Sequence, residues 1–270
     1  MRPTLSTTEV LNDAADAVTR VAAPWMGLLW MLSLPLRLCQ AHFVARVIDL
    51  GPESGQYGAH LFGIALAAAA ALLPALWARA VFVRALGLSL RRAASPGAEA
   101  LRVPAASLAC YVYAALAIEV LFFALGWTLV ALPLLMVMGG LAAAIAPLCE
   151  QPGLVRPFRE IARHLSHGRV LVGLVTVFAI AFFVVFINLL FVFALGLWLA
   201  GAIPGLDPAP WQVLLDFGNE RYLLVLCAGA LLAVEPFWLG ACVVYVHKVR
   251  SRQSGEDLRL WFERLRSEAA

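Results

Sequence analysis

Charged side chains are scarce in this sequence. Of its 270 residues, 14% are Asp, Glu, Lys or Arg and 63% are hydrophobic. Soluble domains carry about 25% charged and roughly 45–50% apolar residues. The net charge of +3 is too small to indicate nucleic acid as a partner. We therefore expect lipid, rather than water, to surround most of this chain.

Lysine and recognisable catalytic motifs are also missing. Lys248 is the only lysine, and this bias toward Arg and Ala is typical of bacterial genes rich in G and C. The five cysteines form no C-x-x-C pair, so we interpret them as small apolar side chains. The sequence contains no G-x-S-x-G, H-E-x-x-H or Walker loop. We expect a protein without catalytic activity and without a cofactor.

Long runs without charge are what the sequence has in abundance. Residues 105–149 contain a single charge, and as one straight helix they would be about 67 Å long. The hydrocarbon core of a bilayer is only about 30 Å thick, so this run must form two helices, which we divide at Gly126. The fold class is therefore all-α, a polytopic membrane protein with six transmembrane helices. These spans are predicted over residues 24–50, 60–78, 105–125, 128–149, 170–200 and 222–247.

Basic residues are distributed unevenly between the two ends of these spans. Seventeen of the twenty Lys and Arg residues lie on the side of both termini, and only Arg46 and Arg221 lie on the other. Arg79 is counted with the seventeen, at the start of a connection whose polar part is residues 87–103. Cytoplasmic loops carry the excess of Lys and Arg. We therefore predict both termini in the cytoplasm and a location in the bacterial inner membrane.

An amphipathic helix is predicted in each cytoplasmic terminus, residues 1–21 and 248–270, outside a transmembrane domain of residues 22–247. In the first, Ser6 and Glu9 form a capping box, and we expect the helix to lie at the membrane surface. In the last, Ser254 caps a helix with Asp257 at its third position. Each helix has an apolar face at helical spacing, formed by Val10, Leu11, Ala14, Ala15 and Val18 in the first and by Leu258, Trp261, Phe262 and Leu265 in the last.

A third amphipathic helix is predicted between the fourth and fifth spans. Arg156, Arg159 and Arg163 lie opposite Phe158 and Ile161 at helical spacing. A basic helix of this kind can lie on a bilayer surface and bind anionic lipid head groups, which are the first expected partner. The alternative is a solvated connector whose charges only determine topology. A protein partner could also bind this surface or the C-terminal helix.

The end of the chain resembles a motif of known membrane domains. After the last span the sequence has Arg250-x-Arg252-x-x-Gly255-x-Asp257 followed by Leu258. It is similar to the closing motif of bacterial membrane domains of the glycerophosphoryl diester phosphodiesterase type and of related families. Two positions depart from that pattern, where Ser254 and Glu256 replace an acidic and an aromatic residue. The resemblance implies a six-span fold with an accessory role, beside a separate catalytic domain.

Three charges lie inside the predicted spans, namely Arg37, Glu119 and Glu235. At ~1.5 Å per residue they are about 20, 21 and 18 Å from the cytoplasmic side. A charge at mid-bilayer costs at least about 2.5–3.5 kcal/mol, so we expect Arg37 to meet one or both carboxylates inside the bundle. A carboxylate left over would hold a proton. Ser33 and Gln40 share the helix face of Arg37 and extend this candidate polar cluster.

Two functions fit these observations. In the first, the protein is an accessory or scaffold subunit that docks a partner through its cytoplasmic helices, and the ion pair fixes helix register. In the second, it is a small proton- or cation-linked transporter or channel that uses Arg37, Glu119 and Glu235. A water-filled cavity reaching the carboxylates would favour transport. A sealed bundle with an exposed apolar groove would favour the accessory role.

Overall fold

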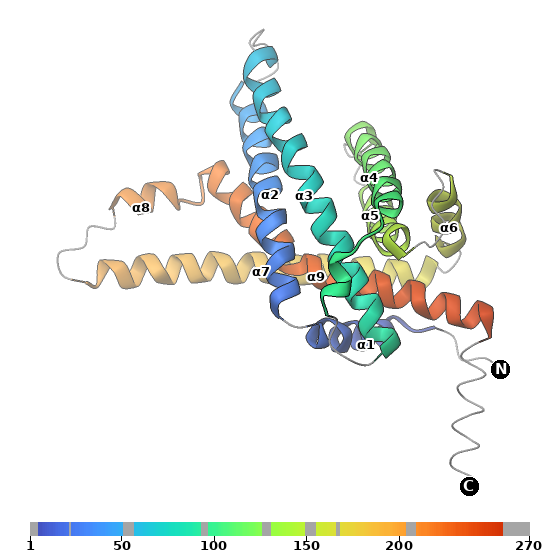
Figure 1. The fold of residues 1–270 in the computed structure, drawn as a ribbon. Helices are drawn as coiled ribbons and strands as arrows, with labels where there is room; N and C mark the ends of the chain where they lie inside the picture. The colour runs from blue at the N-terminus through green and yellow to red at the C-terminus, as the bar shows by residue number, and fades with distance from the viewer. Residues whose placement is uncertain are drawn as a thin grey trace. The chain divides into compact units, whose positions relative to one another are not determined.

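The computed structural model describes residues 5–21, 23–50, 57–92, 97–125, 131–148, 155–165, 168–203 and 209–255, and these residues form helices and short connections without strands. Figure 1 shows the helices, whose order and bounds are α1 (Thr7–Arg20), α2 (Ala23–Leu50), α3 (Tyr57–Arg92), η1 (Ala98–Leu101), α4 (Ala105–Leu125), α5 (Ala131–Ile145), η2 (Ala146–Leu148), α6 (Arg156–His164), α7 (Gly168–Gly201), α8 (Ala209–Leu214) and α9 (Glu220–Ser254).

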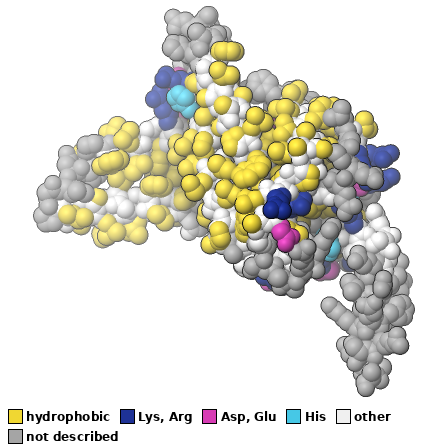
Figure 2. Space-filling view, in the orientation of Figure 1, with side chains coloured by type: hydrophobic (Ala, Val, Ile, Leu, Met, Phe, Trp, Pro, Cys, Tyr) yellow, Lys and Arg dark blue, Asp and Glu magenta, His cyan; other side chains and the backbone are white. Residues whose placement is uncertain are grey.

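Among the residues that the structure describes, four helices are long and apolar enough to cross a membrane. They contain the segments Ala23–Val47, Leu61–Leu90, Gly168–Gly201 and Glu220–Ser254. Shorter apolar helices cover Ala105–Leu121 and Pro133–Leu148. Figure 2 shows apolar side chains over much of the visible face, with Lys and Arg in a few separate groups. A chain with this surface is a membrane protein.

Two helices continue well beyond the predicted span ends. α3 was expected to leave the membrane at residue 78, with a polar connection from residue 87, but it runs to Arg92. α9 runs to Ser254, which makes Ser254 the last residue of this helix. Gly255 follows with φ +73°, the left-handed conformation in which glycine commonly ends a helix. The predicted C-terminal stripe of Leu258, Trp261, Phe262 and Leu265, with Asp257, lies outside the described residues.

The chain divides into two compact units. Unit 1 comprises Met1–Ala22, Ala80–Val175 and Phe237–Ala270, and unit 2 comprises Ala23–Arg79 and Thr176–Pro236. The helices α3, α7 and α9 contribute residues to both units.

In unit 1, α1 packs its apolar face against α9. The capping interaction predicted for Ser6 is present, since its hydroxyl accepts a hydrogen bond of 3.1 Å from the Glu9 amide. A Cβ atom at Gly240 would lie 2.6 Å from Cγ2 of Val18, so only glycine allows this approach. The buried face consists of Val10, Ala14, Ala17 and Val18. Leu11 and Ala15, which were expected on it, are more exposed. Protein, and not lipid, therefore covers this face of α1.

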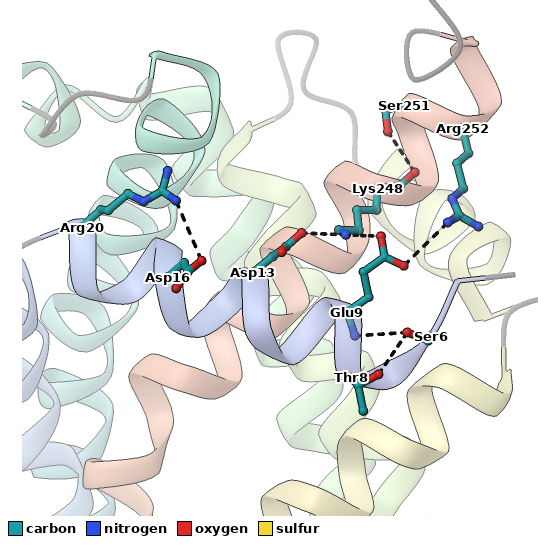
Figure 3. Close-up of polar contacts among 9 residues, drawn as sticks. All are labelled: Ser6, Thr8, Glu9, Asp13, Asp16, Arg20, Lys248, Ser251 and Arg252. Carbon is teal, nitrogen blue, oxygen red and sulfur yellow. Dashed lines mark hydrogen bonds and ion pairs between the residues drawn. The ribbon is translucent and has the colours of Figure 1, made fainter. Parts of the chain in front are cut away.

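Ion pairs fasten the polar side of α1 to the end of α9 (Figure 3). The Lys248 ammonium contacts the Glu9 carboxylate and lies 2.6 Å from Oδ2 of Asp13. Arg252 reaches the same Glu9 carboxylate at 4.0 Å. Glu9 and Asp13 are one turn apart on α1, so a single cation on α9 bridges both.

Elsewhere in unit 1, α4 and α5 pack side by side, with α6 against both (Figure 1). The Phe158 ring of α6 meets the Tyr113 ring of α4 edge-on, with centroids 6.0 Å apart. The Tyr245 hydroxyl donates a hydrogen bond to the His164 carbonyl at the end of α6. Ile161 is 1% exposed. The apolar face of α6 is thus covered by protein as well.

Candidate intramembrane ion cluster

A buried ion cluster joins three helices of unit 2. Arg37 of α2 places Nη2 3.4 Å from Oε2 of Glu235 on α9. Arg79 of α3 donates from Nε to the other carboxylate oxygen, Oε1. The side chain of Glu235 is 7% exposed, and those of Arg37 and Arg79 are 22% and 13% exposed. Each oxygen of the buried carboxylate therefore has its own guanidinium.

A polar stripe on α2 leads into this cluster. Trp30, Ser33, Arg37 and Gln40 recur at helical spacing on one face. Gln40 accepts a hydrogen bond of 3.1 Å from Nη1 of Arg37, and this bond helps to orient the guanidinium toward Glu235. Ser33 is fully buried in the same stripe. The face that the sequence predicts to be polar is thus turned into unit 2.

A proline inside α9, Pro236, directly follows Glu235 of the cluster. Pro236 has no amide hydrogen, so the carbonyl of Leu232, four residues earlier, loses its normal helical donor. The indole Nε1 of Trp30 donates to that carbonyl at 2.9 Å. A side chain of α2 therefore replaces the backbone hydrogen bond that Pro236 removes, and α2 contacts α9 both here and at Glu235.

The cluster differs in its membership from the predicted one. The structure brings together Arg37, Glu235 and Gln40, with Ser33 on the same face of α2, and it adds Arg79. Glu119 lies exposed on α4 of unit 1 and forms none of the ion pairs found between described residues.

The sequence interpretation treated Arg79 as a topology signal because the second span was ended at residue 78. A usable signal was present, since Arg79 is followed by the apolar run Ala80–Val83, all of it now buried in α3. An arginine flanked on both sides by apolar helix is an intramembrane charge, and such charges need a partner.

Two pockets lie elsewhere in unit 2. The larger, about 400 Å³, is lined by residues of α8 and the start of α9, including Arg221 and Tyr222. The smaller, about 260 Å³, is apolar and lies between α7 and Trp211. Neither is lined by Arg37, Arg79 or Glu235. Within the described residues, no group of His, Cys, Asp or Glu is arranged to hold a metal ion.

The other predicted surface residues are divided between contact and exposure. On α6, Arg159 and Arg163 are exposed and Arg156 is half-buried. In the closing motif, Arg250 is half-buried at the end of α9, Arg252 pairs with Glu9, and Gly255 ends the helix. Of these residues, Arg252 thus connects the end of α9 to α1, and Gly255 terminates α9.

Comparisons of this chain with protein-family models, with curated proteins and with solved structures give no match.

Proposed function

We propose that this protein is a non-catalytic membrane protein of accessory or scaffold type, in which the ion cluster ties helices together. The observation that supports this most directly is the state of Glu235. It is buried, both of its oxygens are engaged by arginines, and neither pocket reaches it. A carboxylate held in this way fixes the packing of α2, α3 and α9.

The proposal includes six spans of the bacterial inner membrane with both termini in the cytoplasm. The 21 residues of α4 would form a helix of about 31 Å, which matches a hydrocarbon core of about 30 Å. α5 and η2 continue the apolar run to Leu148. With Arg79 assigned to the interior, sixteen of the twenty basic residues remain on the side of the termini. The asymmetry that supports this orientation is therefore preserved.

Labelling of single cysteines in a cysteine-free variant tests the six spans. With six spans, Thr128→Cys in intact cells reacts with a membrane-impermeant maleimide, whereas Gly97→Cys reacts only after lysis. Gly97 is a suitable control, because a side chain there meets no neighbour within 4 Å. If position 128 reacts only after lysis, residues 105–148 do not cross the membrane twice.

The cytoplasmic helices were expected to dock a partner, and among them α1 and α6 have apolar faces that protein covers. Val10 and Val18 of α1 and Ile161 of α6 are at most 1% exposed. The exposed side chains of α6 are those of Arg159, Ala162 and Arg163, so two of the three are basic. We therefore assign α6 to anionic lipid head groups, for which guanidinium groups are suited.

A proton- or cation-linked transporter is the second candidate. It is favoured by the prolines Pro35, Pro74 and Pro236 in the three helices that carry the cluster, because interrupted helices form the ion sites of many transporters. Purified protein in liposomes with an internal pH-sensitive dye distinguishes the two. A structural tie gives no flux under an imposed potential. A flux that Glu235→Gln abolishes without loss of folded protein would establish transport instead.

A further inference from the structure

One face of α4 is apolar, exposed and interrupted by a carboxylate. Its opposite face is buried in unit 1 through Cys110, Tyr111 and Ala114. Glu119 lies on the exposed side, six residues before the helix ends. Around it the exposed positions recur every three or four residues, at Ala106, Ala109, Tyr113, Leu116 and Val120.

The same chain shows how it accommodates a carboxylate inside an apolar helix. Glu235 is 7% exposed and receives two guanidinium groups. Glu119 has an equally apolar sequence around it but is exposed, and lipid tails offer no hydrogen-bond donor and no counter-charge. The face of α4 therefore carries a charge that lipid alone cannot match.

We propose that this face of α4 docks a membrane helix of a partner protein, which places an Arg or Lys against Glu119. The proposal rests on the six-span layout, because it requires α4 to cross the membrane. It deepens the accessory role by placing the docking surface within the membrane rather than on α1 and α6, whose apolar faces are covered.

Charge and side-chain size identify this occupant. A two-fold contact between α4 helices of two copies would bring two Glu119 carboxyl groups together and would supply no basic side chain to either. A helix with a basic side chain matches the carboxylate instead. Ala106 and Ala109 are small, which allows a partner backbone to approach closely below the carboxylate.

A designed helix tests the charge requirement. A leucine-rich transmembrane peptide with one central Arg, and a matched peptide with Leu at that position, are mixed in vesicles with labelled protein. Energy transfer should report several-fold tighter association of the Arg peptide with the wild type than with Glu119→Gln. The Leu peptide should not discriminate. Glu220→Gln, which removes an exposed carboxylate at the first residue of α9, is the matched control and should behave as wild type.

A photo-crosslinking residue at Leu116 tests the same surface in native membranes. The expected adduct is with a different membrane protein that has a basic residue in an apolar helix, and its yield should fall in Glu119→Gln. The yield of the adduct should recover when Glu119→Arg is combined with a glutamate in place of the partner's basic residue. Adducts only between copies of this chain, or equal binding of the two peptides, would overturn the docking surface. If position 128 is nevertheless labelled from outside, the six-span layout stands and only the docking site is wrong.

Discussion

At the scale of single residues, the chain is defined by where it places charge in apolar surroundings. The sequence identifies Arg37 and Glu235 as intramembrane groups, because each interrupts a long apolar run. It does not identify Arg79 as their neighbour. An arginine near a span end can either determine membrane topology or pack inside the bundle, and the sequence does not distinguish the two. Side-chain geometry resolves this, because Arg79 donates to the carboxylate that Arg37 also contacts.

Replacement of Glu235 by Gln should destabilise the protein strongly. It leaves two largely buried arginines facing a neutral amide, and loss of one member of a buried ion pair costs about 3–5 kcal/mol. Thermal unfolding in detergent should show a large fall in melting temperature. Arg79→Lys keeps the charge but loses the planar donor geometry, so it should lie between wild type and Glu235→Gln. Glu119→Gln is the control, and an equal loss there would contradict a special role for the cluster.

At the scale of helices, sequence alone predicts ends well where an apolar run stops at a turn. α2, α4 and α7 begin and end within two residues of the predicted ranges. α3 and α9 are longer than predicted, because charged residues can continue a helix after the apolar run has ended. The contact of α1 with α9 could not be predicted, since amphipathic periodicity does not say whether protein or lipid covers an apolar face.

The bond between Trp30 and the Leu232 carbonyl should matter only while Pro236 is present. Trp30→Phe removes the indole donor and should cost about 0.5–1.5 kcal/mol, the net value of a hydrogen bond. Pro236→Ala restores an amide hydrogen for that carbonyl. In this background Trp30→Phe should cost much less, and a double-mutant cycle of unfolding free energies measures the difference. Additive costs would mean that Trp30 acts through packing alone.

Gly240→Ala should loosen α1, because the new methyl group would lie 2.6 Å from Cγ2 of Val18. Overpacking of this kind costs about 1–3 kcal/mol. Limited proteolysis near α1 and thermal unfolding should both report the change. Val18→Ala removes the opposing methyl groups and should recover part of the loss. Gly63→Ala is the matched control, since a Cβ atom there meets nothing within 4 Å. An equal loss of stability in both variants would contradict a close contact of α1 with α9 at Gly240.

At the scale of the whole molecule, apolar composition determines the membrane environment, and basic residues determine the proposed orientation. Four helices meet the length and hydropathy of a span, and two shorter ones complete the proposed six. Composition could not indicate which apolar faces are internal. The structure shows that the apolar faces of α1 and α6 are internal, and that Arg159 and Arg163 are the exposed charged side chains of α6.

The double variant Arg159→Gln and Arg163→Gln should weaken the dependence on anionic lipid. A guanidinium near an anionic surface contributes about 1 kcal/mol. The rise in melting temperature on adding phosphatidylglycerol to detergent-solubilised protein should therefore shrink in this variant. Arg46→Gln, an exposed arginine on the opposite side in the proposed topology, should leave that rise unchanged. An unchanged response in the double variant would mean that α6 does not bind anionic lipid and is only a connector.

The ion pairs of Lys248 have a chemical consequence. Because Lys248 is the only lysine in this sequence, it is the one side chain here that amine-directed reagents can modify. The ammonium that they would modify joins Glu9 and Asp13 to α9, and acylation removes its charge. Acylation of this one side chain would therefore remove both of its ion pairs with α1 without any change of sequence, and the apolar packing of α1 on α9 would remain.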